Sequence, residues 1–461
     1  MRTRTLVALA ILAAVAVASW WSLRGNARRD AGASDRRPLF AADEVPLESV
    51  DRVRLERPSG GVPAIEFRRT DAGWAQVEPF AHPADPGAIR QVIDTAAALE
   101  STRAVDPAAL EPEARVALGL EPPRARLTLG WPGGERTVEL GRRTVAGRAW
   151  ARVAGRPEAT SVDASLHAAA VDGDPRQWRS TRLLDAAAAD VARIEVRYGP
   201  GDAQLVVLAR AGGAWRVERP FATRADPESA RGYVDALLRA EVDAFASDSV
   251  SDLGAFGLAA PERSVRLLAP PARPGEAPRA VSAVEVGVAV AEGAPERFAR
   301  IDGRPAVVQL GNKALAALFP PPAYFVDPRG SSAVPADVRR VEFRRTAGAD
   351  PEFALERTLD EWSLRVAGGD GPVPADRERA RRLLAQLCEA RAPAVAFQPM
   401  PEALVRGEFR LVGAADAELG RVRVAREDAG QWALDNADGV LRVHPAGFDV
   451  ATDAAAYVGR R

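Results

Sequence analysis

Apolar and polar positions repeat with one spacing in three stretches of the chain. A pair of apolar residues in strand-like alternation is followed 21 residues later by a tryptophan, at Trp74, Trp215 and Trp362. Two further apolar residues stand nine and seven positions before each tryptophan. Self-similarity of this kind is the signature of tandem units. The pattern therefore predicts three related repeats, each beginning with three strands.

A helical pattern follows each tryptophan. Asp85 and Asp226 come 11 residues after it, Asp376 comes 14 residues after it, and the first two precede a proline, as expected at a helix N-terminus. Apolar residues then recur 4, 7, 8 and 11 positions after the aspartate: Ile89, Val92, Ile93 and Ala96; Ala230, Tyr233, Val234 and Leu237; Ala380, Leu383, Leu384 and Leu387. One apolar stripe of this width predicts a helix packed on the three-stranded sheet beside it.

The second halves of the first two repeats also match. Gly119-Leu120 with Pro123 corresponds to Gly257-Leu258 with Pro261, and further matching pairs are Val138–Gly141 with Val284–Gly287 and Ala151–Pro157 with Ala299–Pro305. The third repeat lacks the Gly-Leu-x-x-Pro step, which predicts a divergent or capping copy.

These patterns predict an α+β fold. We expect tandem repeated units of mainly antiparallel sheet with a helix on one face, two of them full and one reduced, preceded by one N-terminal transmembrane helix. The expected boundaries are a membrane anchor at 1–24, a polar linker at 25–46, and repeats at 47–187, 188–330 and 331–461.

The anchor is predicted from Leu6–Leu23, a run of 18 residues without a charge. Such a helix is about 27 Å long, close to the thickness of the bilayer core. A signal peptide cleaved after Ala16-Val17-Ala18 is the alternative. A strict count of the flanking arginines would place the C-terminal side in the cytoplasm. A short basic start before an apolar run is, however, how export signals begin, and long domains are translocated largely regardless of charge. We therefore expect a single-pass protein of the inner (cytoplasmic) membrane with most of the chain extracytoplasmic.

Composition and charge argue against two classes of function, nucleic-acid binding and thiol chemistry. A formal net charge of −1 argues against nucleic-acid binding. The single cysteine, Cys388, lies on the apolar face of the third helix and predicts a buried small residue rather than a reactive thiol.

No catalytic, metal-binding or cofactor-binding set is legible in the sequence. The histidines, His82, His167 and His444, are far apart without metal-ligand spacing, and we interpret them as surface or turn residues. Asp435–Gly439 begins like a calcium loop but lacks the glutamate at its twelfth position, so a hairpin turn is expected. An envelope hydrolase with a dispersed pair of acidic residues stays open, because such pairs are recognised only by geometry.

Two sets of repeated residues allow a binding interpretation. Arg152 and Arg300, on matching predicted strands, are a possible surface for anionic groups; the alternative is an outward arginine in an alternating strand. The three repeated tryptophans favour core packing over glycan stacking.

The membrane-anchored start, the step from each tryptophan to Pro79-Phe80 or Pro220-Phe221, the capped helix and the Gly-Leu-x-x-Pro element resemble the bacterial family called domain of unknown function 4340 (DUF4340). The resemblance covers residues 47–330 and part of the third repeat. It implies a cell-envelope protein associated with ABC transport systems of the gliding-motility type, and it supplies no catalytic residue. The expected function is thus a non-catalytic, membrane-anchored scaffold or accessory; a glycan- or peptidoglycan-binding module is the alternative.

Overall fold

A computed structural model describes residues 37–461 except 42–43, 59–62, 145–146, 200–203, 249–251, 262, 274, 346–349, 428–429 and 460–461. The expected anchor at Leu6–Leu23 lies outside the described residues. Among the described helices, none combines the length and the apolar character that a membrane span requires. The chain divides into two compact units, and the boundary along the sequence falls between Thr181 and Arg182.

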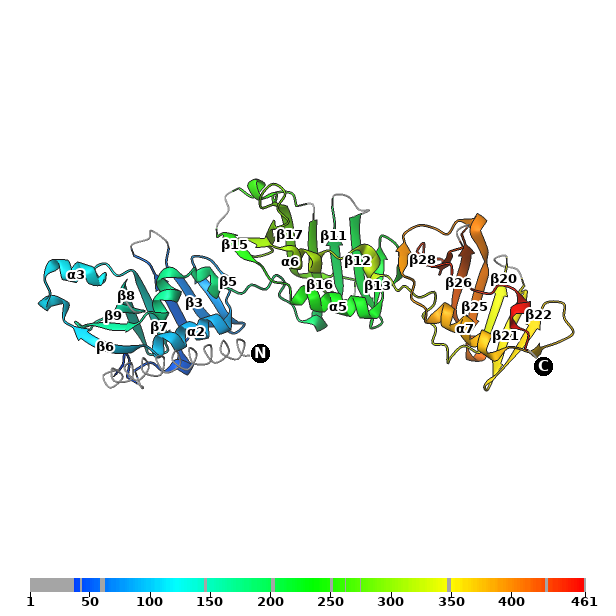
Figure 1. Ribbon diagram of the computed structural model, residues 1–461, viewed down its shortest axis with the longest axis horizontal. Coiled ribbons are helices and arrows are strands. Elements are labelled where there is room, and N and C mark those ends of the chain that lie inside the picture. The colour runs from blue at the N-terminus through cyan, green and yellow to red at the C-terminus, as the bar shows by residue number, and fades with distance from the viewer. Residues whose placement is uncertain are drawn as a thin grey trace, which may run out of the picture. The chain divides into compact units, whose positions relative to one another are not determined.

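The first unit contains the first repeat, a sheet of ten antiparallel strands (Figure 1). In spatial order the strands are β1 (Arg37–Pro38), β6 (Glu100–Val105), β10 (Ala159–Asp163), β9 (Arg148–Val153), β8 (Gly134–Arg143), β7 (Ala125–Trp131), β2 (Arg52–Glu56), β3 (Ile65–Thr70), β4 (Gly73–Glu78) and β5 (His82–Pro83). The helices are α2 (Pro86–Ala97), α3 (Pro112–Leu118) and α4 (Ser165–His167), which continues into a π-helical turn at Ala168–Asp172. Leu39, Phe40 and Val45, within the range expected for the linker, are buried in this core.

The second unit contains two sheets of nine antiparallel strands. The second repeat has, in spatial order, β14 (Thr223–Arg224), β13 (Ala214–Arg219), β12 (Leu205–Ala211), β11 (Arg193–Arg197), β16 (Arg263–Ala269), β17 (Arg279–Ala289), β18 (Arg297–Ile301), β19 (Val307–Leu310) and β15 (Ala244–Ser247). Its helices are α5 (Pro227–Leu238) and α6 (Asn312–Leu318).

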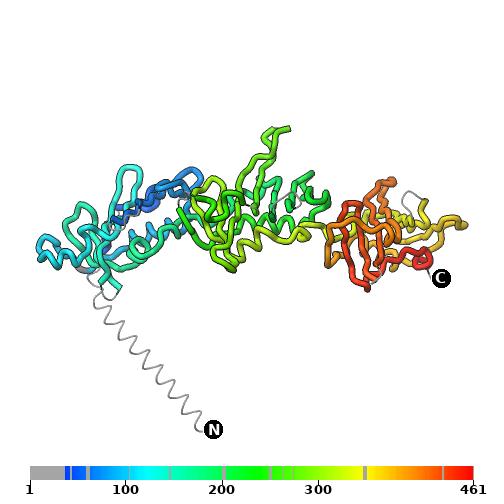
Figure 2. The backbone as a smooth tube through the Cα atoms, turned by 90° about the horizontal axis from the view of Figure 1, so that it is seen from above, coloured from blue at the N-terminus to red at the C-terminus, as the bar shows by residue number. Residues whose placement is uncertain are grey.

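The third repeat has the same spatial order: β23 (Val373–Pro374), β22 (Glu361–Val366), β21 (Phe353–Thr358), β20 (Arg340–Arg344), β25 (Val405–Val412), β26 (Glu418–Arg426), β27 (Trp432–Asp435), β28 (Leu441–His444) and β24 (Ala394–Ala396). Its helix is α7 (Arg377–Cys388). Each sheet is built from one continuous stretch of chain, as the colours in Figure 2 show.

The expectation of a reduced third copy is wrong with respect to the sheet. Strand for strand, β23 through β24 follow the same path as β14 through β15. The Gly-Leu-x-x-Pro step is not needed to form these strands, because inward-facing Phe409, Leu411, Val422 and Val424 give them a buried face. What the third copy does lack, among the described residues, is a counterpart of α6.

The Gly-Leu step serves a local purpose in the other two repeats. A Cβ added at Gly287 would lie 2.0 Å from the Phe256 carbonyl oxygen, and one at Gly141 would lie 2.3 Å from that of Leu118. Glycine is therefore required where the chain crosses close to the sheet. The third repeat, without this crossing, carries Ala425 after Val424, in a small apolar cluster with Met400.

The three helices bury the stripes expected from the sequence. All twelve of those positions are buried, as is Cys388. Asp85 accepts hydrogen bonds from the Gly87 and Ala88 amides, and Asp376 accepts them from Glu378 and Arg379. Asp226 stands at the same position of α5 but does not cap it with its side chain.

Candidate functional site

Arg152 and Arg300 occupy the same register position in their sheets. Arg152 lies opposite Glu139 and Arg300 opposite Glu285, and each ion pair has an N–O distance of 2.7 Å. Their charges are thus compensated on the neighbouring strand. The third repeat reverses the pair, because Arg423 lies opposite Asp435, 4.0 Å apart.

The interpretation of the histidines as surface or turn residues is wrong. His82, His167 and His444 are all buried, because His82 lies on β5 and His444 on β28 within their sheets, and His167 ends α4, which packs in the first core through Leu166. Burial lowers the pKa of His167 and of His444 to about 4, so both are neutral at neutral pH. His444 stacks on Phe448 at a centroid distance of 3.8 Å. No group of three or more His, Cys, Asp or Glu side chains capable of holding a metal occurs in the described part of the chain.

Each repeated tryptophan packs against a hydrophobic core and is met by an arginine from the adjacent strand. Arg69 lies 5.9 Å from the Trp74 ring centroid, Arg210 lies 5.4 Å from that of Trp215, and Arg357 lies 5.8 Å from that of Trp362. These are cross-strand partners in every case. The core-packing interpretation is confirmed, and the guanidinium groups stand against the rings in cation–π contact.

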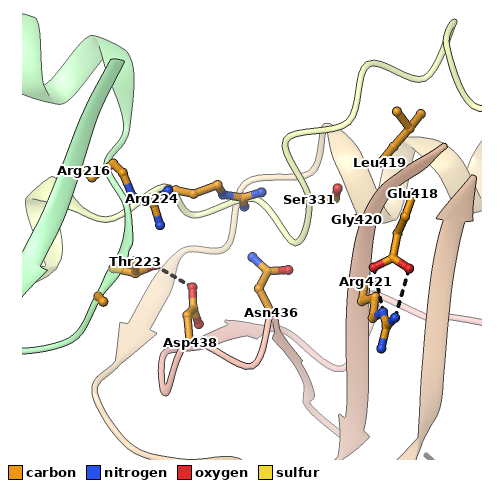
Figure 3. Close-up of a pocket in the computed structure, with 11 residues that line it drawn as sticks. Arg216, Thr223, Arg224, Ser331, Glu418, Leu419, Gly420, Arg421, Asn436 and Asp438 are labelled. Atoms are coloured by element: carbon orange, nitrogen blue, oxygen red, sulfur yellow. Dashed lines mark hydrogen bonds and ion pairs between the residues drawn. The ribbon is translucent and has the colours of Figure 1, made fainter. Parts of the chain in front are cut away.

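A polar pocket of about 330 Å³ lies where the third repeat meets the β13–β14 edge of the second (Figure 3). Its second-repeat wall contains Arg216, Thr223 and Arg224. Its third-repeat wall comprises Ser331, Glu418, Leu419, Gly420, Arg421, Asn436 and Asp438. These residues come from four separate stretches of sequence, so no local sequence motif predicts the pocket.

The segment leading into the third repeat helps to open the pocket. Arg329 forms an isolated β-bridge with Arg391, and Arg182 forms the equivalent bridge with Glu241 in the second repeat. Counting from these bridges, Gly330 and Ser331 occupy the positions of Leu183 and Leu184. The two leucines are buried in the core of the second repeat. A Cβ at Gly330 would lie 2.8 Å from the Leu387 carbonyl oxygen, which excludes a leucine there. Ser331 thus gives the third repeat a small polar group where the second has a large apolar one.

The hairpin Asp435–Gly439 forms the floor, and its prediction as a turn is confirmed, since it joins β27 to β28. The Asp438 carboxylate accepts hydrogen bonds from Thr223 at 2.5 Å and from Arg442 at 2.8 Å. Burial alone would raise the pKa of Asp438, but the hydrogen bonds from Arg442 and Thr223 outweigh it and lower that pKa. Burial and the neighbouring Asp438 raise the pKa of Asp435.

Arg442 fixes this hairpin against the second repeat. Its side chain is fully buried, and it donates to the carbonyl oxygens of Asp327 and Val440 and to Thr223 as well as to Asp438. Nearby, Val440 joins the hydrophobic core of the second repeat. A buried arginine with all these partners holds the floor of the pocket in one position.

Several polar atoms of the pocket have no partner within the described residues. Both the Nδ2 and Oδ1 atoms of Asn436 are buried without a hydrogen bond, and so is Nε of Arg224. In Figure 3 the Asn436 side chain extends from the hairpin toward the space between Arg224 and Ser331. Arg216 is exposed and has no ion pair within that same part of the chain.

The two carboxylates of the pocket, Glu418 and Asp438, both form ion pairs with arginines. Arg421 forms two hydrogen bonds to Glu418 at 2.8 and 2.9 Å, and Arg410 adds a third. The hydrogen bond from Arg421 is the main reason that the pKa of Glu418 falls to about 2. Glu418 and Asp438 are therefore both ionised at neutral pH, whereas acid–base catalysis by a carboxyl pair needs one of them protonated.

Comparison with known protein families also finds a repeated unit in the sequence. The domain of unknown function DUF4340 matches residues 74–214 and 215–406. No curated protein and no solved structure matches the chain. Both family matches begin at a repeated tryptophan, so each runs from within one sheet into the first strands of the next. With two copies of this domain over more than half of its length, the chain belongs to the DUF4340 family.

Proposed function

We propose that the protein is a non-catalytic interaction protein of the cell envelope, tethered to the membrane by residues 6–23. The observation that carries this proposal is the repetition of one strand order in three sheets. Repeats of this kind present related surfaces several times along one chain, which suits contact with another protein. A tether raises the effective concentration of these surfaces near membrane partners, so that weak individual contacts suffice.

The joint between the second and third repeats supports a scaffold. Arg391 binds Asp226 at 2.7 Å, Phe221 stacks on Phe397 with an interplanar angle of 6°, and Arg442 is buried between the repeats. Such contacts hold two repeated surfaces in a fixed relation. The partner that we propose is an integral membrane complex of the ABC transport type, as the family resemblance implies.

Crosslinking in native membranes, followed by mass spectrometry of the co-purified proteins, tests the proposal. We expect an integral membrane partner whose recovery falls when residues 1–24 are deleted. Recovery of cell-wall sacculi by the purified chain, with no membrane protein crosslinked, would instead support the wall-binding function. Arg210→Gln and Arg357→Gln, which uncover Trp215 and Trp362, would then strengthen sacculus binding if the tryptophans stack on glycans.

A further inference from the structure

We propose that the pocket between the second and third repeats binds a small organic carboxylate that carries a hydrogen-bond donor next to its anionic group. A scaffold does not require such a ligand, so this inference goes beyond the function proposed above. It rests on three properties of the pocket: its uncompensated positive charge, its unpartnered amide and its size.

The charge of the lining favours an anion. Arg421 is paired with Glu418, and Asp438 is paired with buried Arg442, so these residues leave little net charge. Arg224 lies 3.6 Å from Asp327 but keeps its buried Nε without a partner, and Arg216 contributes a further guanidinium at the rim. Guanidinium groups are well matched to carboxylates, because their parallel N–H groups donate to both oxygens.

Asn436 indicates which chemical group of the ligand lies next to its carboxylate. Its buried amide offers N–H donors at Nδ2 and an acceptor at Oδ1, and neither atom has a partner within the described residues. Leaving a buried polar group unsatisfied costs about 1–3 kcal/mol, so a ligand that satisfies both atoms is favoured over a bare anion. An amide N–H or a hydroxyl adjacent to the carboxylate donates to Oδ1 while a ligand oxygen accepts from Nδ2.

The size of the cavity sets the class of molecule. A volume of about 330 Å³ is near the lower end for small-molecule sites. The pocket thus fits one small acid, such as an N-acylated amino acid, rather than a folded partner.

Titration of the full-length chain with N-acetylglycine, acetate and inorganic phosphate, followed by calorimetry, tests the inference. We expect saturable binding of N-acetylglycine, weaker binding of acetate, and weaker binding of phosphate. Asn436→Ala should weaken N-acetylglycine binding by about tenfold or more and bring it to the level of acetate. Arg216→Gln should weaken both carboxylates by a similar factor, again about tenfold.

Arg381→Gln, which changes an exposed arginine on α7 outside the pocket, is the matched control and should leave every affinity unchanged. Asn436→Ala removes a side chain without partners, so the variant should fold as stably as the parent in thermal denaturation. Equal affinities for phosphate and N-acetylglycine, or an Asn436→Ala variant that binds N-acetylglycine as well as the parent does, would overturn the proposal. So would the absence of saturable binding at millimolar concentrations, since water alone then occupies the pocket.

Discussion

Arg391 donates a hydrogen bond to Asp226 across 165 residues of chain, with its Nη2 2.7 Å from Oδ2. Asp226 stands at the helix N-terminal position where Asp85 and Asp376 cap their own helices. In the second repeat this aspartate is instead buried and directed to the third repeat. One member of a repeated set of helix caps has thus become a contact between repeats.

Replacing Arg391 with glutamine should lower the free energy of unfolding of the second unit by about 1–3 kcal/mol, because it leaves a buried carboxylate without its charged partner. Urea denaturation followed by tryptophan fluorescence measures this change. Arg382→Gln, which removes an exposed partner of Glu378 in the same repeat, should cost about 0.5 kcal/mol or less. Equal effects of the two variants would show that Asp226 does not depend on Arg391.

The buried histidines predict a loss of stability in mild acid. Burial lowers the pKa of His167 from 6.5 to about 4, so the unfolded chain takes up a proton at a higher pH than the folded chain does. The contribution of neutral His167 is therefore complete above pH 6.5 and falls as the pH decreases from 6.5 toward 4. His167→Gln should flatten the dependence of stability on pH in this range, as measured by denaturation at successive pH values. A curve parallel to that of the parent would contradict the shift.

Gly287→Ala should destabilise the second repeat by about 1–3 kcal/mol, because its Cβ would overlap the Phe256 carbonyl oxygen, a backbone atom. Thermal denaturation gives the comparison. Gly447→Ala is the control, since a Cβ there meets nothing within 4 Å, and it should stay within about 0.5 kcal/mol of the parent. If both substitutions were neutral, the close crossing of the Gly-Leu step over β17 would be wrong.

Leu359 offers a stabilising substitution. It is 87% exposed at the tip of the β21–β22 hairpin, with φ at 56°, where the second repeat has Gly212 at 57°. A left-handed conformation costs a side-chain-bearing residue about 1–2 kcal/mol, and part of this is regained with glycine. Leu359→Gly should therefore raise the free energy of unfolding by about 0.5–1 kcal/mol. Leu359→Ala removes the same exposed surface but keeps the Cβ, so it should bring no such gain.

The sequence predicted the elements that depend on local periodicity. The stripe at Ile89, Val92 and Ile93 is buried because a helix with one apolar face must cover it, and the spacing alone reveals this. The turn at Asp435–Gly439 was also readable from its residue types.

What the sequence did not reveal depends on residues far apart in the chain. The role of Asp226 is set by Arg391, and the pocket exists because the hairpin near Asn436 meets Arg224. The completeness of the third sheet was missed for a different reason. In the first two repeats the Gly-Leu step crosses the sheet only at Gly141 and Gly287. Its loss in the third repeat therefore does not predict the loss of the strands themselves, whose buried face is formed by Phe409 and Val422.

The two walls of the pocket belong to different repeats: Arg216 and Arg224 lie on strands of the second, and Asn436 lies on a hairpin of the third. Any molecule held by both walls is released when the sheets separate. By mass action its binding then opposes that separation, and the effect grows with the logarithm of its concentration. The stiffness of the joint between these two repeats would in this way report the local abundance of a small solute.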